Sequence, residues 1–294
     1  MAGMTRREAI AAGGAAALGG ALAAGPARAA QGDKVVKVGK IRQSVSKWCF
    51  DRLKLKLDEF CRICKEIGLV GIDLVGPGEW KTIRDAGLVP TMGSVGAGSI
   101  PNGIQDPKNH DGIVKKLEEV MPRAAAEGVP NVITFFGNRK GMEDGPAIEN
   151  SIECLQRCKP IAEANKVVLA VEYLNSKVNH KDYLGDRTPY CVKIVSAVNS
   201  PYVKILWDIY HAQIMEGDII RTIQQNNQWF GHYHTGGNPG RNEIDDSQEL
   251  YYPAICRAIL KTGYTGYVAH EFIPKKADPV KSLRDAVALC DVDV

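Results

Sequence analysis

The sequence predicts an α/β fold, a single (β/α)8 TIM barrel, from three observations. From about residue 35 onward, short runs rich in β-branched residues alternate with amphipathic stretches, which is typical of a parallel sheet covered by helices. Eight strand-like runs can be counted. No G-x-G-x-x-G follows the first of them, which disfavours the alternative of a doubly wound open sheet. With 294 residues and 45% hydrophobic content, the chain can bury one large core, and we predict one barrel domain over residues 35–294.

The strands are predicted wherever short runs of Val, Ile, Leu and aromatic residues occur, and the helices wherever apolar residues recur every three or four positions. The predicted strands are, in order, Val35–Val45, Val70–Val75, Val89–Ser94, Asn131–Phe136, Val167–Leu174, Val203–Tyr210, Trp229–His234 and Tyr267–Phe272. The predicted helices are Leu53–Ile67, Trp80–Ala86, Asp111–Glu127, Ala147–Asn165, Pro189–Val198, Ile219–Asn227, Tyr251–Thr262 and Val280–Leu289. Several of these helical patterns close on a glycine, such as Gly68, where the left-handed capping conformation costs little.

Residues 1–30 differ in kind from the rest of the chain. The pair Arg6-Arg7 precedes an Ala/Gly/Leu run, which ends before the small-residue sequence Ala27-Arg28-Ala29. This is the arrangement of an export signal, and the paired arginines are typical of twin-arginine leaders, which export folded proteins. We therefore predict a periplasmic protein whose mature chain has no membrane span, the alternative being a disordered Ala-rich tail.

Export is expected to need both arginines of the leader. Replacing Arg6 and Arg7 together with Lys should abolish periplasmic accumulation, because the twin-arginine signal depends on that pair. Cell fractionation followed by immunodetection measures the outcome. Unchanged periplasmic accumulation would contradict the twin-arginine interpretation.

The charge balance excludes one class of function. The formal net charge is +3, and the leader supplies most of it through Arg6, Arg7 and Arg28 against Glu8. The remaining chain is nearly neutral, so it offers no broad basic face of the kind that binds nucleic acid.

The eight cysteines are predicted to be mostly free, buried thiols, because folding before export separates folding from the oxidising compartment. Cys61 and Cys64 form a C-x-x-C inside a helical pattern. No second pair completes a zinc site, so we interpret them as core-facing helix residues.

Four successive predicted strands carry a polar side chain near their carboxyl ends, where the active site of such a barrel forms. These residues are Glu172, Asp208, His234 and Glu271. Because side chains alternate along a strand, Glu172 shares a face with Ala170, and a small residue beneath a carboxylate suits a crowded barrel interior. The same rule places His232 one layer below His234, and we interpret it as a hydrogen-bonded core histidine.

Three carboxylates and one imidazole that converge at the mouth of a barrel would repel one another's charge and raise one another's pKa. A bound divalent cation resolves that conflict. Oxygen-rich ligands with one nitrogen favour a single Mg²⁺ or Mn²⁺, whereas Zn²⁺ or Co²⁺ remains open from ligand type alone.

The strand-end motifs also resemble a known family. The strings are VEYLNSKVNHKDYL, WDIYHAQIMEGD, GHYHTGGNPGRNEI and GYVAHEFIPK. They are similar, in order and spacing, to those of hydroxypyruvate isomerase and its relatives in the xylose isomerase-like barrel superfamily. The resemblance runs from about residue 35 to the C-terminus, and it is strongest to exported, leader-bearing members.

The resemblance implies roles for individual residues. Glu172, Asp208, His234 and Glu271 would bind the metal, and the two glutamates would also form the acid/base pair. His211 and Arg241 match residues that contact substrate oxygens in the family. The chain departs from the family at His234, where bacterial hydroxypyruvate isomerase has an amide and sugar epimerases have histidine, and in a shorter segment after Arg241.

Two further residues are candidate substrate contacts because they lie at the same rim of the predicted barrel. Trp48 follows the first strand. Asn175 opens the loop Asn175–Leu184, which is rich in Lys, Asn and His and is either a lid or a solvated loop.

The expected reaction moves a proton between neighbouring carbons of a small keto acid or sugar through an enediolate, with a divalent ion on the substrate oxygens and two carboxylates as base and acid. An isomerase that converts hydroxypyruvate to 2-hydroxy-3-oxopropanoate, or acts on a related keto sugar, is the first expectation. A ketose 3-epimerase and a lyase or hydratase of 3-keto sugars are the alternatives, and a non-catalytic sugar-binding barrel is disfavoured by the intact acid/base pair. The sequence leaves open whether the protein forms a homo-oligomer.

Overall fold

Eight parallel strands form the centre of the protein. The computed structural model describes residues 34–294, so the predicted leader 1–30 lies outside the described residues. The strands are β1 (Arg42–Ser46), β2 (Gly71–Asp73), β3 (Val89–Pro90), β4 (Asn131–Phe135), β5 (Val168–Glu172), β6 (Val203–Asp208), β7 (Phe230–Thr235) and β8 (Tyr267–His270). They lie in the order β3-β2-β1-β8-β7-β6-β5-β4, and each neighbouring pair is parallel. The predicted fold class is therefore confirmed, because each of the eight predicted runs overlaps one of these strands.

The two ends of this curled sheet meet beyond β3. Gly93 follows β3, donates its backbone N–H to Asn131 O at 2.8 Å and accepts one from Ile133 N at 3.1 Å. A Cβ on Gly93 would lie 3.0 Å from the ring of Trp80 and 3.3 Å from Val132, so the absence of a side chain allows this approach. A single bridge, in place of a full ladder, joins β3 to β4.

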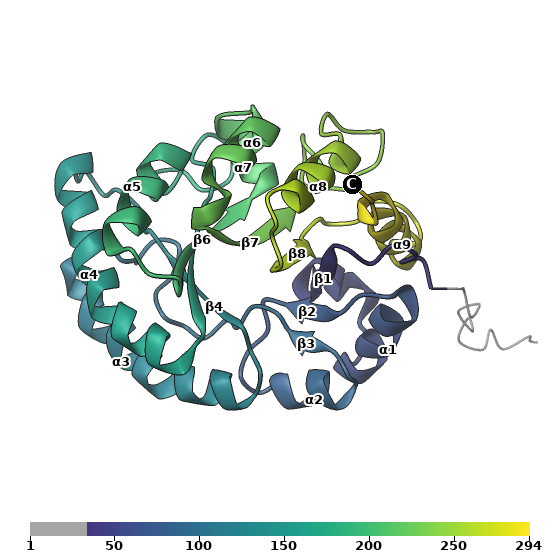
Figure 1. Ribbon diagram of the computed structural model, residues 1–294, viewed down its shortest axis with the longest axis horizontal. Coiled ribbons are helices and arrows are strands. Elements are labelled where there is room, and N and C mark those ends of the chain that lie inside the picture. Colours follow the sequence, from purple (N-terminus) through teal and green to yellow (C-terminus); the bar gives the residue numbers. More distant parts are fainter. Residues whose placement is uncertain (1–33) are drawn as a thin grey trace, which may run out of the picture. The chain divides into compact units, whose positions relative to one another are not determined.

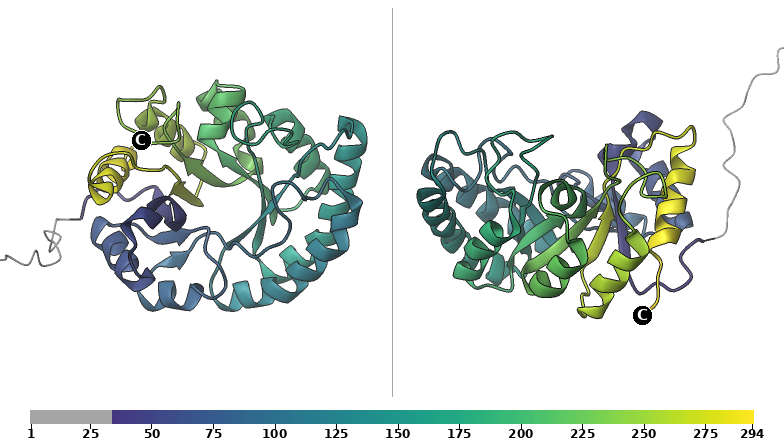
Figure 2. Two further views of the ribbon diagram at one scale, coloured as in Figure 1. Left: turned by 180° about the vertical axis from the view of Figure 1, so that it is seen from behind. Right: turned by 90° about the horizontal axis from the view of Figure 1, so that it is seen from above.

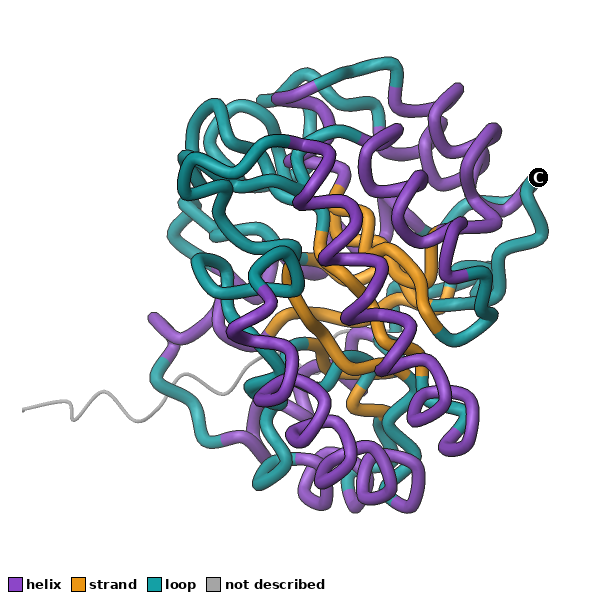
Figure 3. Tube along the Cα trace, turned by 90° about the vertical axis from the view of Figure 1, so that its left-hand side faces the viewer, coloured by secondary structure: helices purple, strands orange, loops and turns teal. Residues whose placement is uncertain are grey.

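Helices cover the outside of the strands, as Figures 1 and 2 show. They are α1 (Leu57–Ile67), α2 (Trp80–Asp85), α3 (Pro107–Ala126), α4 (Asp144–Asn165), α5 (Thr188–Val198), α6 (Ile209–Met215), α7 (Ile219–Asn226), α8 (Tyr252–Lys261) and α9 (Pro279–Cys290), with 3₁₀ turns η1 (Lys47–Leu53) and η2 (Asn227–Trp229). In Figure 3 the strands lie inside the helices, and loops gather at one end of the barrel. Within residues 34–294, none of the helices has the length and apolar character needed to span a bilayer.

The helix faces carry the predicted core cysteines. All eight cysteines are free and buried, and Cys61 and Cys64 both lie on the core face of α1. Gly68 ends that helix with a φ of 106°, and its N–H bonds to the carbonyl of Cys64, as the capping interpretation predicted. The C-x-x-C is therefore a packing feature.

Several predicted boundaries differ from those of the structure, and for two strands the contacts explain why. The first strand begins at Arg42 and not at Val35, because the backbone N–H groups of Lys37, Val38 and Gly39 bind the carboxylate of Asp291 instead of a neighbouring strand. The sixth strand ends at Asp208, and the short helix α6 replaces its predicted last residues. The strand gives way to a helix for a local reason: the Asp208 carboxylate accepts the backbone N–H of His211 and so caps the N-terminus of α6.

A small apolar layer fills the barrel below its carboxyl end. It consists of Met92, Ile133, Ala170 and Leu206, which come from β4, β5, β6 and the residues after β3. Because side chains alternate along a strand, the residue two positions after Ala170 or Leu206 lies on the same inward face and one layer higher. Those two positions are Glu172 and Asp208.

Candidate metal centre and active site

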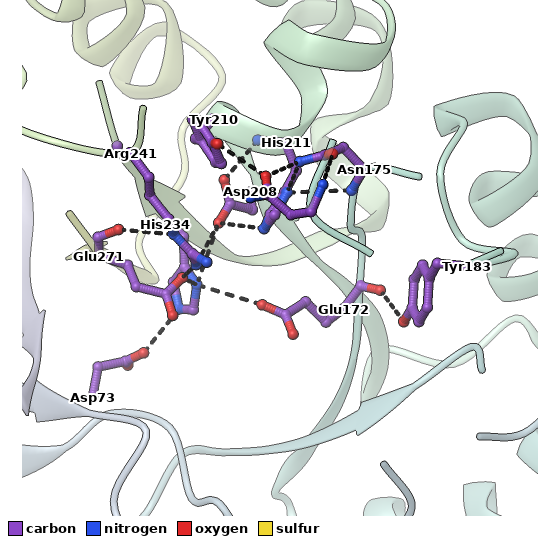
Figure 4. Close-up of polar contacts among 12 residues, drawn as sticks. Asp73, Glu172, Asn175, Tyr183, Asp208, Tyr210, His211, His234, Arg241 and Glu271 are labelled. Atoms are coloured by element: carbon purple, nitrogen blue, oxygen red, sulfur yellow. Dashed lines mark hydrogen bonds and ion pairs between the residues drawn. The ribbon is translucent and has the colours of Figure 1, made fainter. Parts of the chain in front are cut away.

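The four predicted ligands meet at the carboxyl ends of β5 to β8. Glu172 ends β5, Asp208 ends β6, His234 lies in β7 and Glu271 directly follows β8. One ligand atom from each can be chosen so that all lie within 4.8 Å of one another, and all four residues are buried. Figure 4 shows their side chains converging from these separate strands. The sequence thus predicted the members of this cluster.

His234 lies at the centre of the cluster. Its Nδ1 is 2.6 Å from Glu271 Oε2, 3.8 Å from Glu172 Oε1 and 3.9 Å from Asp208 Oδ2. Its Nε2 points away from them and lies 2.9 Å from Oδ2 of Asp73 at the end of β2. The ring therefore spans the cluster and a further carboxylate beneath it.

Glu271 is held by three partners. Trp48 donates its indole N–H to Oε1 at 3.0 Å, and Arg241 Nη2 lies 2.5 Å from Oε2, on the same side as His234. Arg241 Nη2 is also 3.6 Å from Asp208 Oδ2, so the guanidinium lies between two of the carboxylates. Trp48 and Arg241, both predicted as substrate contacts, are thus brought to the cluster.

Burial and charge push the proton affinities of these acids apart. Burial, together with the charge of Glu271, raises the pKa of Glu172 to about 8. Burial, partly offset by Arg241, raises the pKa of Asp208 to about 6. Burial also acts to raise the pKa of Glu271, but Arg241 and His234 outweigh it and hold that pKa well below its usual range. Two carboxylates of different proton affinity are what an acid and base pair requires.

The cluster has the properties expected of a divalent metal site. Asp208 Oδ2, His234 Nδ1 and Glu271 Oε2 are buried and make no well-aligned hydrogen bond with the described residues, although they crowd together. Ions such as Mg²⁺ and Zn²⁺ bind oxygen and nitrogen ligands at about 2.0–2.2 Å, so two ligand atoms on opposite sides of one ion lie about 4 Å apart. The ligand atoms of this cluster, which all lie within 4.8 Å of one another, have a compatible spacing. One ion would give these atoms a partner and offset the repulsion that raises the pKa of Glu172.

His211 and Asn175 lie beside the cluster. His211 is fully buried, its Nδ1 accepts the backbone N–H of Asn175 at 3.2 Å, and its Nε2 is 3.8 Å from Asp208 Oδ2. Burial, and then Arg241, lower the pKa of His211 well below its usual value, so the ring is neutral. The side chain of Asn175 is also fully buried and is bonded to Asn179, so it supports His211 and the following loop and does not line the cavity.

A cavity of about 350 Å³ opens over the two glutamates. Its polar side is formed by Glu172, Glu271, Arg241 and His180, whose ring lies 5.3 Å from that of His211. The rest of the lining is mainly apolar and includes Trp48. The apolar residues are Leu74, Ile100, Ile133, Phe135 and Leu174. A larger hollow of about 610 Å³ between α7 and α8 holds Lys261 as its one charged lining residue and no part of the cluster.

Sequence reasoning missed Asp73 and His180. Asp73 ends its strand with a carboxylate just as Glu172 and Asp208 do, so the strand-end rule could have found it. His180 lies in the loop Asn175–Leu184, and no sequence pattern indicates where that loop lies relative to the site.

Comparison with known proteins gives a consistent result. A model of the xylose isomerase-like TIM barrel family matches residues 52–291. The 2-oxo-tetronate isomerase of Pectobacterium atrosepticum is 23% identical over 236 residues, covering 74% of this chain and 87% of that protein. The hydroxypyruvate isomerase of Escherichia coli is 33% identical over 101 residues, covering 33% of this chain and 39% of that protein.

Solved structures share the fold. The 3-keto-D-glucoside 4-epimerase YcjR from E. coli, in its apo form, superposes with a TM-score of 0.70 at 18% identity, covering 85% of this chain and 98% of that one. The IOLI protein with a bound zinc atom superposes with a TM-score of 0.63 at 17% identity, covering 85% of this chain and 95% of that one.

Proposed function

The chain belongs to the xylose isomerase-like TIM barrel family, and we propose that it is a divalent-metal-dependent isomerase of the hydroxypyruvate isomerase type. The proposed reaction converts hydroxypyruvate to 2-hydroxy-3-oxopropanoate or interconverts a related keto sugar. One observation carries this proposal above the others: Glu172 and Glu271, two buried carboxylates of the four-residue cluster, both line the same cavity. The names of the isomerase relatives support it.

Glu172, Asp208, His234 and Glu271 would hold the ion, with Mg²⁺ or Mn²⁺ proposed and Zn²⁺ or Co²⁺ as alternatives. When bound, such an ion polarises a substrate carbonyl and makes the neighbouring C–H more acidic.

The two glutamates would move the proton. One takes a proton from the carbon next to the carbonyl and the other returns a proton to the former carbonyl carbon. The hydroxyl proton passes to the former carbonyl oxygen, and these transfers together interconvert an aldose and a ketose. The indole N–H of Trp48 and the guanidinium of Arg241 fix the orientation of Glu271 for this task. Rigid positioning of this kind contributes to catalysis by limiting unproductive geometries.

His211 and Arg241 would orient the substrate. Because Nδ1 of His211 accepts a backbone N–H, the proton of the neutral ring is on Nε2, which can donate to a substrate oxygen. Arg241 presents a planar fork suited to a carboxylate or to paired hydroxyls. The apolar wall around Ile133 and Phe135 would keep water from the reacting carbons.

A ketose 3-epimerase is the second candidate, because the cluster has histidine at position 234, as sugar epimerases do, where bacterial hydroxypyruvate isomerase has an amide. A lyase or hydratase of 3-keto sugars would use the same first proton abstraction. The proposed periplasmic location, through the leader at residues 1–30, favours scavenged carbohydrates over the cytoplasmic metabolite hydroxypyruvate.

The proposal is tested by solvent exchange. The metal-loaded enzyme is incubated in D₂O with hydroxypyruvate, with ketohexoses or with 3-keto sugars, and NMR follows the hydrogen next to the carbonyl. Deuterium is expected to enter that position of the true substrate, because each of the candidate reactions begins by removing this proton. The product then distinguishes isomerisation, epimerisation and elimination. Turnover of a substrate without deuterium in the product would refute the proton-transfer proposal.

A further inference from the structure

Asp73 forms a second polar group directly beneath the candidate metal centre. Its Oδ2 lies 2.9 Å from Nε2 of His234, and its Oδ1 lies 3.0 Å from Nε2 of His232. Thr91 donates its hydroxyl to Oδ1 at 2.6 Å. All four side chains are fully buried, so no solvent competes for these contacts.

The contact crosses the inside of the barrel. Asp73 ends β2 and both histidines lie in β7, and β1 and β8 stand between these two strands in the sheet. In Figure 4 Asp73 approaches His234 from the side opposite the other carboxylates. The ring of His234 is therefore held from below by one carboxylate while its other edge faces the three carboxylates of the cluster.

The donor and acceptor chemistry of Asp73 fixes where the histidine protons are. An ionised carboxylate only accepts hydrogen bonds, so Nε2 of His234, which bonds to Oδ2, must carry a proton. Asp73 is used as an acceptor at both oxygens, since the Thr91 hydroxyl donates to Oδ1 and Nε2 of His234 lies 2.9 Å from Oδ2. With Nε2 engaged by Asp73, Nδ1 is the nitrogen that faces Glu172, Asp208 and Glu271, and it is the atom that an ion would reach.

We propose that Asp73 is the positioning residue of the metal centre: it holds His234 in the Nε2–H tautomer and fixes its ring plane, so that Nδ1 is available as the ligand. The inference rests on the metal site of the proposed function. In it, Asp73 does not bind the ion and affects it only by orienting His234. A carboxylate that accepts the second N–H of a ligating histidine raises the basicity of the ligand and orients its ring, and loss of such a partner typically weakens metal binding by about 10–100-fold.

The tautomer can be measured without altering the protein. Full-length protein labelled with ¹⁵N-histidine and loaded with Zn²⁺ is studied by long-range ¹H–¹⁵N correlation NMR, which identifies the protonated nitrogen of each ring. His234 is expected to carry its proton on Nε2. A proton on Nδ1 of His234 in the loaded protein would overturn the proposal even if every Asp73 variant failed to fold.

Asp73→Asn gives a sharper test, because the structure predicts how the amide will turn. The Thr91 hydroxyl donates to Oδ1, and Nε2 of His232 lies 3.0 Å from the same oxygen, so the amide oxygen should take that side. The amide NH₂ then faces His234 and donates to Nε2, which moves the ring proton to Nδ1. Competitive chelator titration with Zn²⁺ should show affinity about 10–100-fold below wild type, and the NMR spectrum of the variant should show that Nε2 of His234 no longer carries a proton. Asp73→Ala should also weaken binding.

Thr91→Val is the matched control. It removes one hydrogen bond from the same buried carboxylate and keeps nearly the same shape, but it leaves the bond between Asp73 and His234 in place. It should lower the unfolding temperature and keep wild-type affinity for Zn²⁺. If Asp73→Asn and Asp73→Ala bind Zn²⁺ as tightly as wild type, Asp73 has no positioning role.

Two other results would overturn the proposal in different ways. Two ions per wild-type chain, the second lost in Asp73→Ala, would mean that Asp73, His232 and His234 form a metal site of their own, and the positioning role would be wrong. A wild-type chain that binds no divalent ion would overturn the proposed function and this inference with it.

Discussion

Replacing Glu172 or Glu271 with Gln should slow exchange of the substrate's α-hydrogen with solvent by about 10²–10⁴-fold, the usual contribution of general acid–base catalysis. Glutamine keeps the size and polarity of the side chain and removes the charge that accepts the proton. The pKa of Glu172 is raised and that of Glu271 is lowered, so the two variants remove groups of different proton affinity from the same cavity. Deuterium incorporation followed by NMR measures the loss.

The metal content of both variants has to be measured with the exchange rate, because each glutamate is also a proposed ligand. Glu243→Gln is the matched control: Glu243 is buried to the same degree as Glu172, but it accepts backbone N–H groups of Lys275 and Lys276 and lies outside the cluster. It is expected to keep the exchange rate at some cost in stability. Near-normal exchange in both cluster variants would show that the acid/base pair lies elsewhere.

Asp208→Ala and His234→Ala are each expected to abolish the tightly bound ion, because the remaining ligands cannot complete its coordination shell. Elemental analysis of the purified variants measures the occupancy. Thermal unfolding gives a second measure, since an ion that binds only the folded state at a hundred times its Kd stabilises it by about 2.7 kcal/mol. Wild-type protein should gain this stabilisation, and the variants should not.

Asp208 needs a more conservative variant, since its Oδ1 also caps helix α6 by accepting the N–H of His211. Loss of such a cap costs about 0.5–2 kcal/mol by itself. Asp208→Asn keeps an oxygen for the cap and removes the ligand charge, so it should retain the fold and lose the ion. Full metal occupancy in Asp208→Asn and His234→Ala would mean that the ligand set is wrong.

Much of the fold was predictable because its determinants are local. Strand and helix periodicity depend on neighbouring residues, and each predicted strand run overlaps a strand of the structure. The predicted bounds of two strands failed because a distant or competing contact determined where each strand begins or ends. The carboxylate of Asp291, near the other end of the chain, takes the backbone donors of residues 37–39 and delays β1. The N-cap at Asp208 turned a strand-like run into a helix.

By itself, the sequence determined the four cluster residues, because alternation along a strand and the position of a barrel's active site are rules that act within single strands. Only the tertiary structure decided what surrounds them. The curvature of the sheet brings Asp73 of β2 across the barrel to His234 of β7, although two strands separate them in the sheet. The folding of the loop after β5 sets His180 against His211 and buries Asn175. No periodicity encodes those contacts, since they depend on how far the sheet curls and where each loop returns.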